Sequence, residues 1–242
     1  MNKSNVKDDK FMGGDFASRI TAPMRRGKFL TYMGASSAAA ALLVTGCSDD
    51  DNSPMTPPAA GVDLGSGDIG ILNYAYLLEQ LEAAFYVQVI MTPYSGITAA
   101  ETAILTDIRN HELAHRDFFK AALGTAAIAS VEVNFSTIDF TSRASVLGTA
   151  KVFEDLGVSA YNGAGKLITN VDYLLLAGKI VSVEARHASA IRDLLNPYSA
   201  DFSGDDVVAG DTGLDVSNTP TAVLTAASPF VKTKVTFDKL PS

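Results

Sequence analysis

Two segments of the sequence share the spacing Glu-x-x-His, one from Glu112 to His115 and one from Glu184 to His187. Residues three apart lie on one face of an α-helix, so each segment can present a carboxylate and an imidazole to the same point. A buried carboxylate is unfavourable unless its charge is neutralised, and a divalent metal ion neutralises several carboxylates at once. The chain contains three histidines, and the two motifs use two of them. This pattern predicts a metal site built by both segments.

Each motif also has a partner glutamate elsewhere in the chain. An offset of 75 residues aligns Glu79 and Tyr86 with Glu154 and Tyr161, and an offset of 72 aligns the two Glu-x-x-His motifs. The chain therefore reads as two helical hairpins of one design, each supplying one Glu and one Glu-x-x-His, which is the donor set of dinuclear carboxylate bundles. Six metal ligands are expected, with the glutamates of the two motifs bridging the ions: Glu79, Glu112, His115, Glu154, Glu184 and His187.

The donor types indicate the metal and the chemistry. Carboxylate and imidazole suit iron or manganese, and the set contains no thiolate that would favour zinc or copper(I). We expect two Fe or Mn ions that cycle between M(II) and M(III) with O2 or H2O2, in ferroxidase-like or peroxide-removing chemistry. No catalytic residue is assigned beyond the metal ligands. The alternative is a non-enzymatic envelope stress protein, in which the site is structural, vacant or a polar network of side chains.

Glu82 competes with Glu79 for the role of ligand, because it lies one turn further along the same helix face. Glu79 is preferred, since Glu154 repeats its spacing to a tyrosine, whereas Glu82 aligns with Gly157. Glu82 is therefore expected beside the ligands.

Three other side chains are expected next to the ligands. Tyr86 and Tyr161 are candidate hydrogen-bond donors to them or radical traps, with inward-packed tyrosines as the alternative. His111 is a candidate neighbour of a ligand, or a neutral stacked histidine. Together with Glu112 and His115 it also completes His-Glu-x-x-His, the pattern of zinc metallopeptidases. The sequence repeat disfavours the peptidase interpretation, because it aligns His111 with Val183 and preserves Glu-x-x-His alone.

Four helices must position these residues. Apolar residues recur at steps of three and four in four segments. These segments are 69–90, 98–124, a third that runs from 143 to the turn at 170–172, and 173–195. Short turns within each pair and a long connection over 125–141 predict an all-α fold, a ferritin-like four-helix bundle with one crossover between its second and third helices. The connection carries a β-like run at 131–140. Residues 198–242 are expected to form an acidic loop followed by a short helix and a strand that cover the bundle.

A family resemblance extends over about residues 68–197. It is carried by EDLGVSAYNGA at 154–164 and VEARHA at 183–188, with ILNYA at 71–75 and LEQLE at 78–82 in the first helix. These segments resemble the bacterial ferritin-like domain family related to plant desiccation-related proteins. The resemblance implies a metal-binding bundle and members exported with twin-arginine-type signals. For most members it implies no established reaction.

Charge divides the chain into a basic leader and an acidic remainder. Of the 242 residues, 19 are basic and 27 acidic, a formal net charge of -8. Residues 1–46 hold seven of the basic and three of the acidic residues, which leaves -12 on residues 47–242. This balance excludes a nucleic-acid partner, and a single cysteine excludes an intrachain disulfide. A homo-oligomer is compatible with the composition, but a closed ferritin shell is not expected of a tethered chain.

The leader predicts export and lipid attachment. Arg25 and Arg26 precede an uncharged run over 29–46, rich in small residues, which ends at Val-Thr-Gly-Cys. The paired arginines resemble a twin-arginine signal, and the final tetrapeptide resembles a lipobox that would make Cys47 the lipidated N-terminus. The alternative is a single membrane-spanning anchor. The expected division is an export signal at 1–46, a lipidated cysteine and tether at 47–67, the bundle at 68–197 and the extension at 198–242. The location is the envelope, at the outer membrane where the cell has one.

Overall fold

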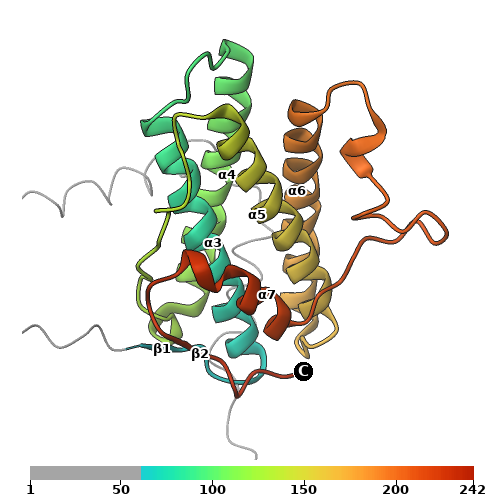
Figure 1. The fold of residues 1–242 in the computed structure, drawn as a ribbon. Coiled ribbons are helices and arrows are strands. Elements are labelled where there is room, and N and C mark those ends of the chain that lie inside the picture. The colour runs from blue at the N-terminus through green and yellow to red at the C-terminus, as the bar shows by residue number, and fades with distance from the viewer. Residues whose placement is uncertain (1–60) are drawn as a thin grey trace, which may run out of the picture. The chain divides into compact units, whose positions relative to one another are not determined.

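Four long helices dominate the computed structural model, which describes residues 61–242. They are α3 (Gly67–Met91), α4 (Ala99–Leu123), α5 (Arg143–Gly165) and α6 (Val171–Leu195). Helix α3 packs mainly on α4 and α5 mainly on α6, and the two hairpins then pack together into the bundle of Figure 1. The predicted all-α bundle with one crossover is confirmed. Arg25, Arg26 and Cys47 lie outside the described residues.

Polar side chains define where three of these helices begin. Thr98 and Glu101 form a capping box, in which the Thr98 hydroxyl accepts from the Glu101 N–H at 3.1 Å and the Glu101 carboxylate accepts from the Thr98 N–H at 2.8 Å. The Ser142 hydroxyl accepts from an N–H in the first turn of α5, and the Asn170 side chain does the same for α6. Each cap satisfies backbone donors that the helix itself leaves unpaired.

The crossover between α4 and α5 covers the outer side of α3. It begins with the 3₁₀ turn η1 (Gly124–Ala126) and continues as irregular chain held by side-chain amides of α3. The β-like run predicted at 131–140 is wrong as a strand, since it makes one isolated bridge, Val133 to Val231. The apolar residues of this run serve aromatic packing instead. The rings of Phe135 and Phe140 pack on Phe85 of α3, with centroid distances of 6.0 and 5.9 Å.

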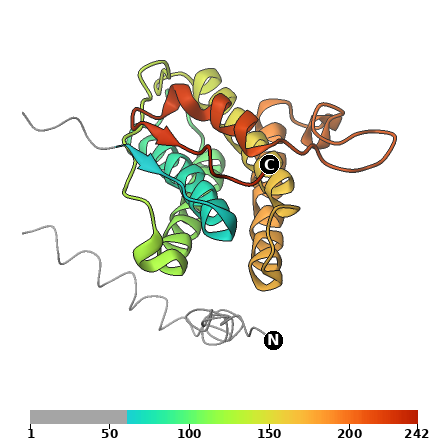
Figure 2. The ribbon, with the colours of Figure 1, turned by 90° about the horizontal axis from the view of Figure 1, so that it is seen from below.

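The C-terminal extension returns to the bundle. It contains the 3₁₀ turns η2 (Ala200–Ser203) and η3 (Ser228–Phe230), helix α7 (Pro220–Ala227) and strand β2 (Val235–Thr236). Val223 and Leu224 of α7 are buried in the core. Strand β2 pairs in parallel with β1 (Val62–Asp63), which joins the two ends of the described chain, as Figure 2 shows. The predicted helix and strand are confirmed.

None of the helices in residues 61–242 is both long enough and apolar enough to cross a membrane.

The extension crosses α5 at a glycine. The Asn218 N–H donates to the Ser159 carbonyl of α5 at 3.0 Å, and a Cβ on Gly163 would lie 1.7 Å from the Asn218 carbonyl oxygen. Only a residue without a side chain allows this approach, so Gly163 determines where the extension lies on α5.

We expect Gly163→Ala to lower the free energy of unfolding by about 1–3 kcal/mol, because the chain segment at Asn218 must shift. Gly148→Ala is the matched control, since a Cβ there meets no atom within 4 Å and alanine favours the helix by about 0.5–1 kcal/mol. Urea denaturation of both variants measures the difference. Equal stability of the two would contradict the close approach.

Candidate metal centre

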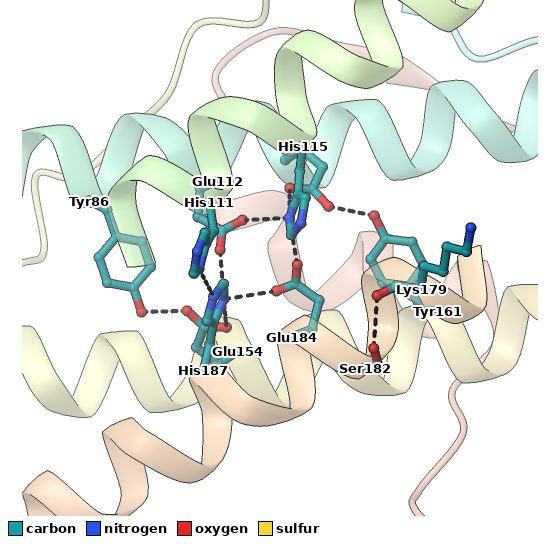
Figure 3. Close-up of polar contacts among 11 residues, drawn as sticks. Tyr86, His111, Glu112, His115, Glu154, Tyr161, Lys179, Ser182, Glu184 and His187 are labelled. Carbon is teal, nitrogen blue, oxygen red and sulfur yellow. Dashed lines mark hydrogen bonds and ion pairs between the residues drawn. The ribbon is translucent and has the colours of Figure 1, made fainter. Parts of the chain in front are cut away.

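The bundle interior brings together all six predicted ligands. Helices α3 and α5 each contribute one glutamate, and α4 and α6 each contribute a Glu-x-x-His pair. Figure 3 shows Glu112, His115, Glu154, Glu184 and His187 pointing toward one another. The side chains of the four glutamates are 0% exposed, against 5% for His187 and 14% for His115. The six residues are Glu79, Glu112, His115, Glu154, Glu184 and His187.

Their donor atoms form two overlapping groups of four. One group consists of Glu79, Glu112, His115 and Glu184, and the other of Glu112, Glu154, Glu184 and His187. Within each group the donor atoms all lie within 4.8 Å of one another. Glu112 and Glu184 belong to both groups, so each can offer one oxygen to either side. Two adjacent positions for a cation therefore share two carboxylates.

The two imidazoles repeat one geometry. Nδ1 of His115 on α4 lies 2.8 Å from a carboxylate oxygen of Glu184 on α6. Nδ1 of His187 on α6 lies 2.8 Å from a carboxylate oxygen of Glu112 on α4. Each nitrogen is also 3.5 Å from the glutamate of its own group on α3 or α5, Glu79 or Glu154. The two halves of the cluster thus correspond to each other in the same way as the two halves of the sequence repeat.

These donor atoms do not satisfy one another. Within residues 61–242, both oxygens of Glu112 and of Glu184, one oxygen each of Glu79 and Glu154, and both Nδ1 atoms have no hydrogen bond of acceptable geometry. Buried polar atoms are rarely left this way, because desolvation without a partner is costly. The short N···O separations lack the alignment of hydrogen bonds, so the lone pairs converge on common points. Divalent cations at these points would satisfy all eight atoms, and oxygen and imidazole donors fit iron or manganese.

A family comparison agrees with this geometry. A model of the ferritin-like domain family matches residues 67–197. The chain belongs to the ferritin-like domain family. A search of curated proteins finds no match to the chain.

Two tyrosines hold the outer carboxylates of this ferritin-like site. The Tyr86 hydroxyl on α3 donates to Glu154 on α5 at 2.5 Å, and the Tyr161 hydroxyl on α5 donates to Glu79 on α3. Burial and the neighbouring carboxylates raise the pKa of both phenols, which therefore remain protonated donors. Each bond orients one carboxylate and leaves its second oxygen for the centre.

His111 lies outside both ligand groups. Its Nδ1 is 2.9 Å from Nε2 of His187, and the two ring planes are 8° apart with their centroids at 5.1 Å. When Nδ1 of His187 binds a cation, its Nε2 carries the proton, and His111 is placed to accept it in a hydrogen bond. A peptidase would need His111 and His115 on one ion, whereas the structure directs His111 to the outer side of His187.

Glu82 is buried on α3 but belongs to neither ligand group. A Cβ on Gly157 of α5 would lie 3.0 Å from a Glu82 carboxyl oxygen, so this side chain occupies the space that its repeat position leaves empty. Burial, reinforced by the charges of Glu112 and three further glutamates, raises the pKa of Glu82 well above its usual value. Burial therefore favours the neutral acid form of Glu82 beside the cluster.

The sequence did not single out Arg192, which is 2% exposed on α6. Its guanidinium forms two hydrogen bonds of 2.7 to 2.8 Å with Asp155, the residue after Glu154, and two of 2.8 to 2.9 Å with Asp206. Arg192 thereby ties the acidic loop to the helix that carries a ligand. One signal in the sequence could have indicated this contact. Arg192 is the last basic residue of α6, and an acid-rich run follows it over 201–215.

Burial and charge set the protonation of the metal-free cluster. Burial raises the pKa of Glu112 well above its usual value and that of Glu154 to about 7. Burial also disfavours the His187 imidazolium, but the surrounding carboxylates outweigh it and raise the pKa of this histidine to about 12. The pKa of His115 is raised for the same reason. Burial opposes ionisation of Glu184, yet the two imidazoles lower its pKa to about 2.

Metal affinity should rise with pH. Near neutrality both histidines hold protons, because their pKa values are raised, and a bound ion must displace these protons, so the affinity grows as protons become scarcer. Calorimetric titration with Mn(II) at about pH 6 and about pH 8, in buffers of different ionisation enthalpy, counts the released protons. Equal affinity at both values with no proton release would contradict the arrangement.

Proposed function

We propose that this protein binds two iron or manganese ions in the centre of the bundle. Glu112 and Glu184 would bridge the ions, with Glu79 and His115 on one ion and Glu154 and His187 on the other. The observation that supports this proposal is the membership of Glu112 and Glu184 in both donor groups. A single cation would explain one of the two donor groups, whereas two cations that share Glu112 and Glu184 explain both.

The metal centre would protect the cell envelope from oxidants by redox chemistry. Iron or manganese bound there supplies one-electron chemistry toward O2 or H2O2, and so ferroxidase-like or peroxide-removing activity. The chain buries the four glutamates away from bulk water, holds Glu79 and Glu154 through the tyrosine hydroxyls, and by burial favours the neutral form of Glu82. His115 is the most exposed of the six residues, which supports approach of a small oxidant from its side.

The number of metal ions tests the proposal. We expect two Fe or Mn ions per chain after reconstitution, and peroxide consumption that depends on them. Glu112→Ala removes a bridging carboxylate and should lose both ions and the activity, whereas Glu79→Ala removes a donor of one group and should retain about one ion. Metal analysis, the visible spectrum and peroxide consumption of the same samples measure these effects.

Glu132→Ala is the matched control, because this glutamate is exposed and its side chain pairs with Lys232 at the surface, away from the metal centre. It should keep both ions. Near-zero Fe and Mn in the reconstituted wild-type protein would exclude the proposed site. Two bound ions without any peroxide or O2 chemistry would instead support a structural role.

We also propose that the protein is an exported lipoprotein related to desiccation-related proteins, on the strength of Arg25, Arg26, the apolar run and the sequence before Cys47. Metabolic labelling with an alkyne fatty acid should label the wild-type protein, and Cys47→Ser should remove the label and release the chain from membranes. Unchanged labelling of Cys47→Ser would show that the lipid is attached elsewhere.

A further inference from the structure

The first turns of α6 expose a cluster of large apolar side chains. Val171, Leu174 and Leu175 are 75%, 43% and 57% exposed. Residues at this spacing share one face of a helix, so the three side chains form one surface, the α6 patch. The five other large apolar side chains that are exposed in residues 61–242 are distributed over α3, α5 and the extension. Single exposed apolar side chains are ordinary, whereas a cluster of them marks a contact surface.

The α6 patch lies at the end of the bundle where the described chain begins. The Asp68 carboxylate at the start of α3 accepts from the Thr169 and Asn170 N–H groups, both at 2.8 Å, and so holds the turn before α6 against α3. Strand β1 leads into the same end of α3 and pairs with β2. Figure 1 shows β1 and β2 at the lower end of the bundle, where α6 also begins. Gly61 therefore lies at the same end as the α6 patch.

A lipid on Cys47 would keep this end of the bundle near the membrane, and the inference rests on that proposed attachment. The 13 residues 48–60 join Cys47 to Gly61. Even a fully extended chain of this length spans at most about 50 Å. Helix α6 has 25 residues and is about 38 Å long. The end that carries the α6 patch is thus tied closest to the lipid, and the other end of α6 lies a helix length away from it.

Charge along α6 also favours a membrane at this end. Lys166, the C-cap of α5, and Lys179, one turn beyond the patch on the same face, are exposed and form no ion pair within residues 61–242. Asp172 is the acid of the first turn. The acid-rich run over 201–215 adjoins the other end of α6, where Asp201 accepts from the C-cap side chain at 2.6 Å. Anionic headgroups would therefore attract the end with the patch and repel the opposite end.

We propose that the α6 patch docks on the surface of the membrane that holds the lipid of Cys47. Its three apolar side chains enter the boundary between headgroups and acyl chains, and the two lysines contact anionic headgroups. The lipid anchor makes a weak contact effective, since docking then occurs within one tethered molecule. A second copy of the chain fits the patch less well, because a stable protein interface typically uses roughly 20–30 residues a side.

The full-length lipidated protein in vesicles of phosphatidylethanolamine and phosphatidylglycerol tests the proposal. Cys47 is the single cysteine of the chain, so lipid on its sulfur leaves an introduced cysteine free for a fluorescent label. Gly178→Cys places the label on the face of the patch, because this glycine is exposed and a Cβ there meets no atom within 4 Å. Ala103→Cys places it in the first turns of α4, at the opposite end. A lipid with a nitroxide on its headgroup should quench the label at 178 and leave the label at 103 unchanged.

Matched variants connect the quenching to the patch. Leu174→Ser combined with Leu175→Ser should lose the quenching at 178, while the protein stays on the vesicles through its lipid. Leu214→Ser, at a leucine of the extension that is 69% exposed, is the control and should keep it. Lys166→Gln combined with Lys179→Gln should weaken the quenching on vesicles with phosphatidylglycerol and have no effect on vesicles of phosphatidylcholine alone. Circular dichroism and thermal unfolding show that each variant is folded.

Flotation of the same vesicles distinguishes failure of the docking from failure of the anchor. A wild-type protein that floats with the vesicles but shows no quenching at 178 overturns the docking and leaves the anchor intact. A protein that does not float overturns the anchor and the docking with it. Quenching that survives the double serine substitution also overturns the docking. Energy transfer between chains labelled at 178, without quenching by the lipid, would instead assign the patch to a second copy.

Discussion

Burial of four glutamates in the centre of one bundle is the constraint on which the rest of the structure depends. Their side chains have no solvent contact, and their free oxygens converge with two imidazole nitrogens. Such a cluster is costly without cations, because desolvation and mutual repulsion both oppose the ionised carboxylates. The surrounding contacts serve to orient it. Tyr86 and Tyr161 hold the outer glutamates from the opposite hairpin, and His111 contacts the outer nitrogen of one imidazole.

The two hairpins repeat this design, and they differ where one half carries an extra group. Glu82 of the first hairpin is matched by Gly157 in the second, and the two positions face each other in the bundle. Were Gly157 to carry a glutamate as well, two buried carboxyls would compete for one space. His111 likewise has valine as its counterpart. The centre is therefore symmetric in its candidate ligands and asymmetric in the groups around them.

Helix α3 explains why a long crossover and a C-terminal extension accompany the bundle. It is apolar on nearly all sides, so α4, α5, the crossover and α7 must all cover it. Polar residues on this helix then have specific tasks, because each buried one needs a partner. Asn73 uses both ends of its amide to hold the crossover, whereas Gln80 holds it through one hydrogen bond, accepted from the Val131 N–H.

The sequence by itself determined the four helices, the single crossover, and the six residues that meet inside the bundle. Helical periodicity and a duplicated spacing are local properties, and residues three apart share a helix face in any fold. Tertiary structure alone decided which contacts form between helices. It placed His111 against His187, set Glu82 opposite Gly157, engaged Arg192 with Asp155 and Asp206, and gave the run at 131–140 aromatic packing in place of strand pairing. These depend on residues distant in the chain, whose approach no local spacing encodes.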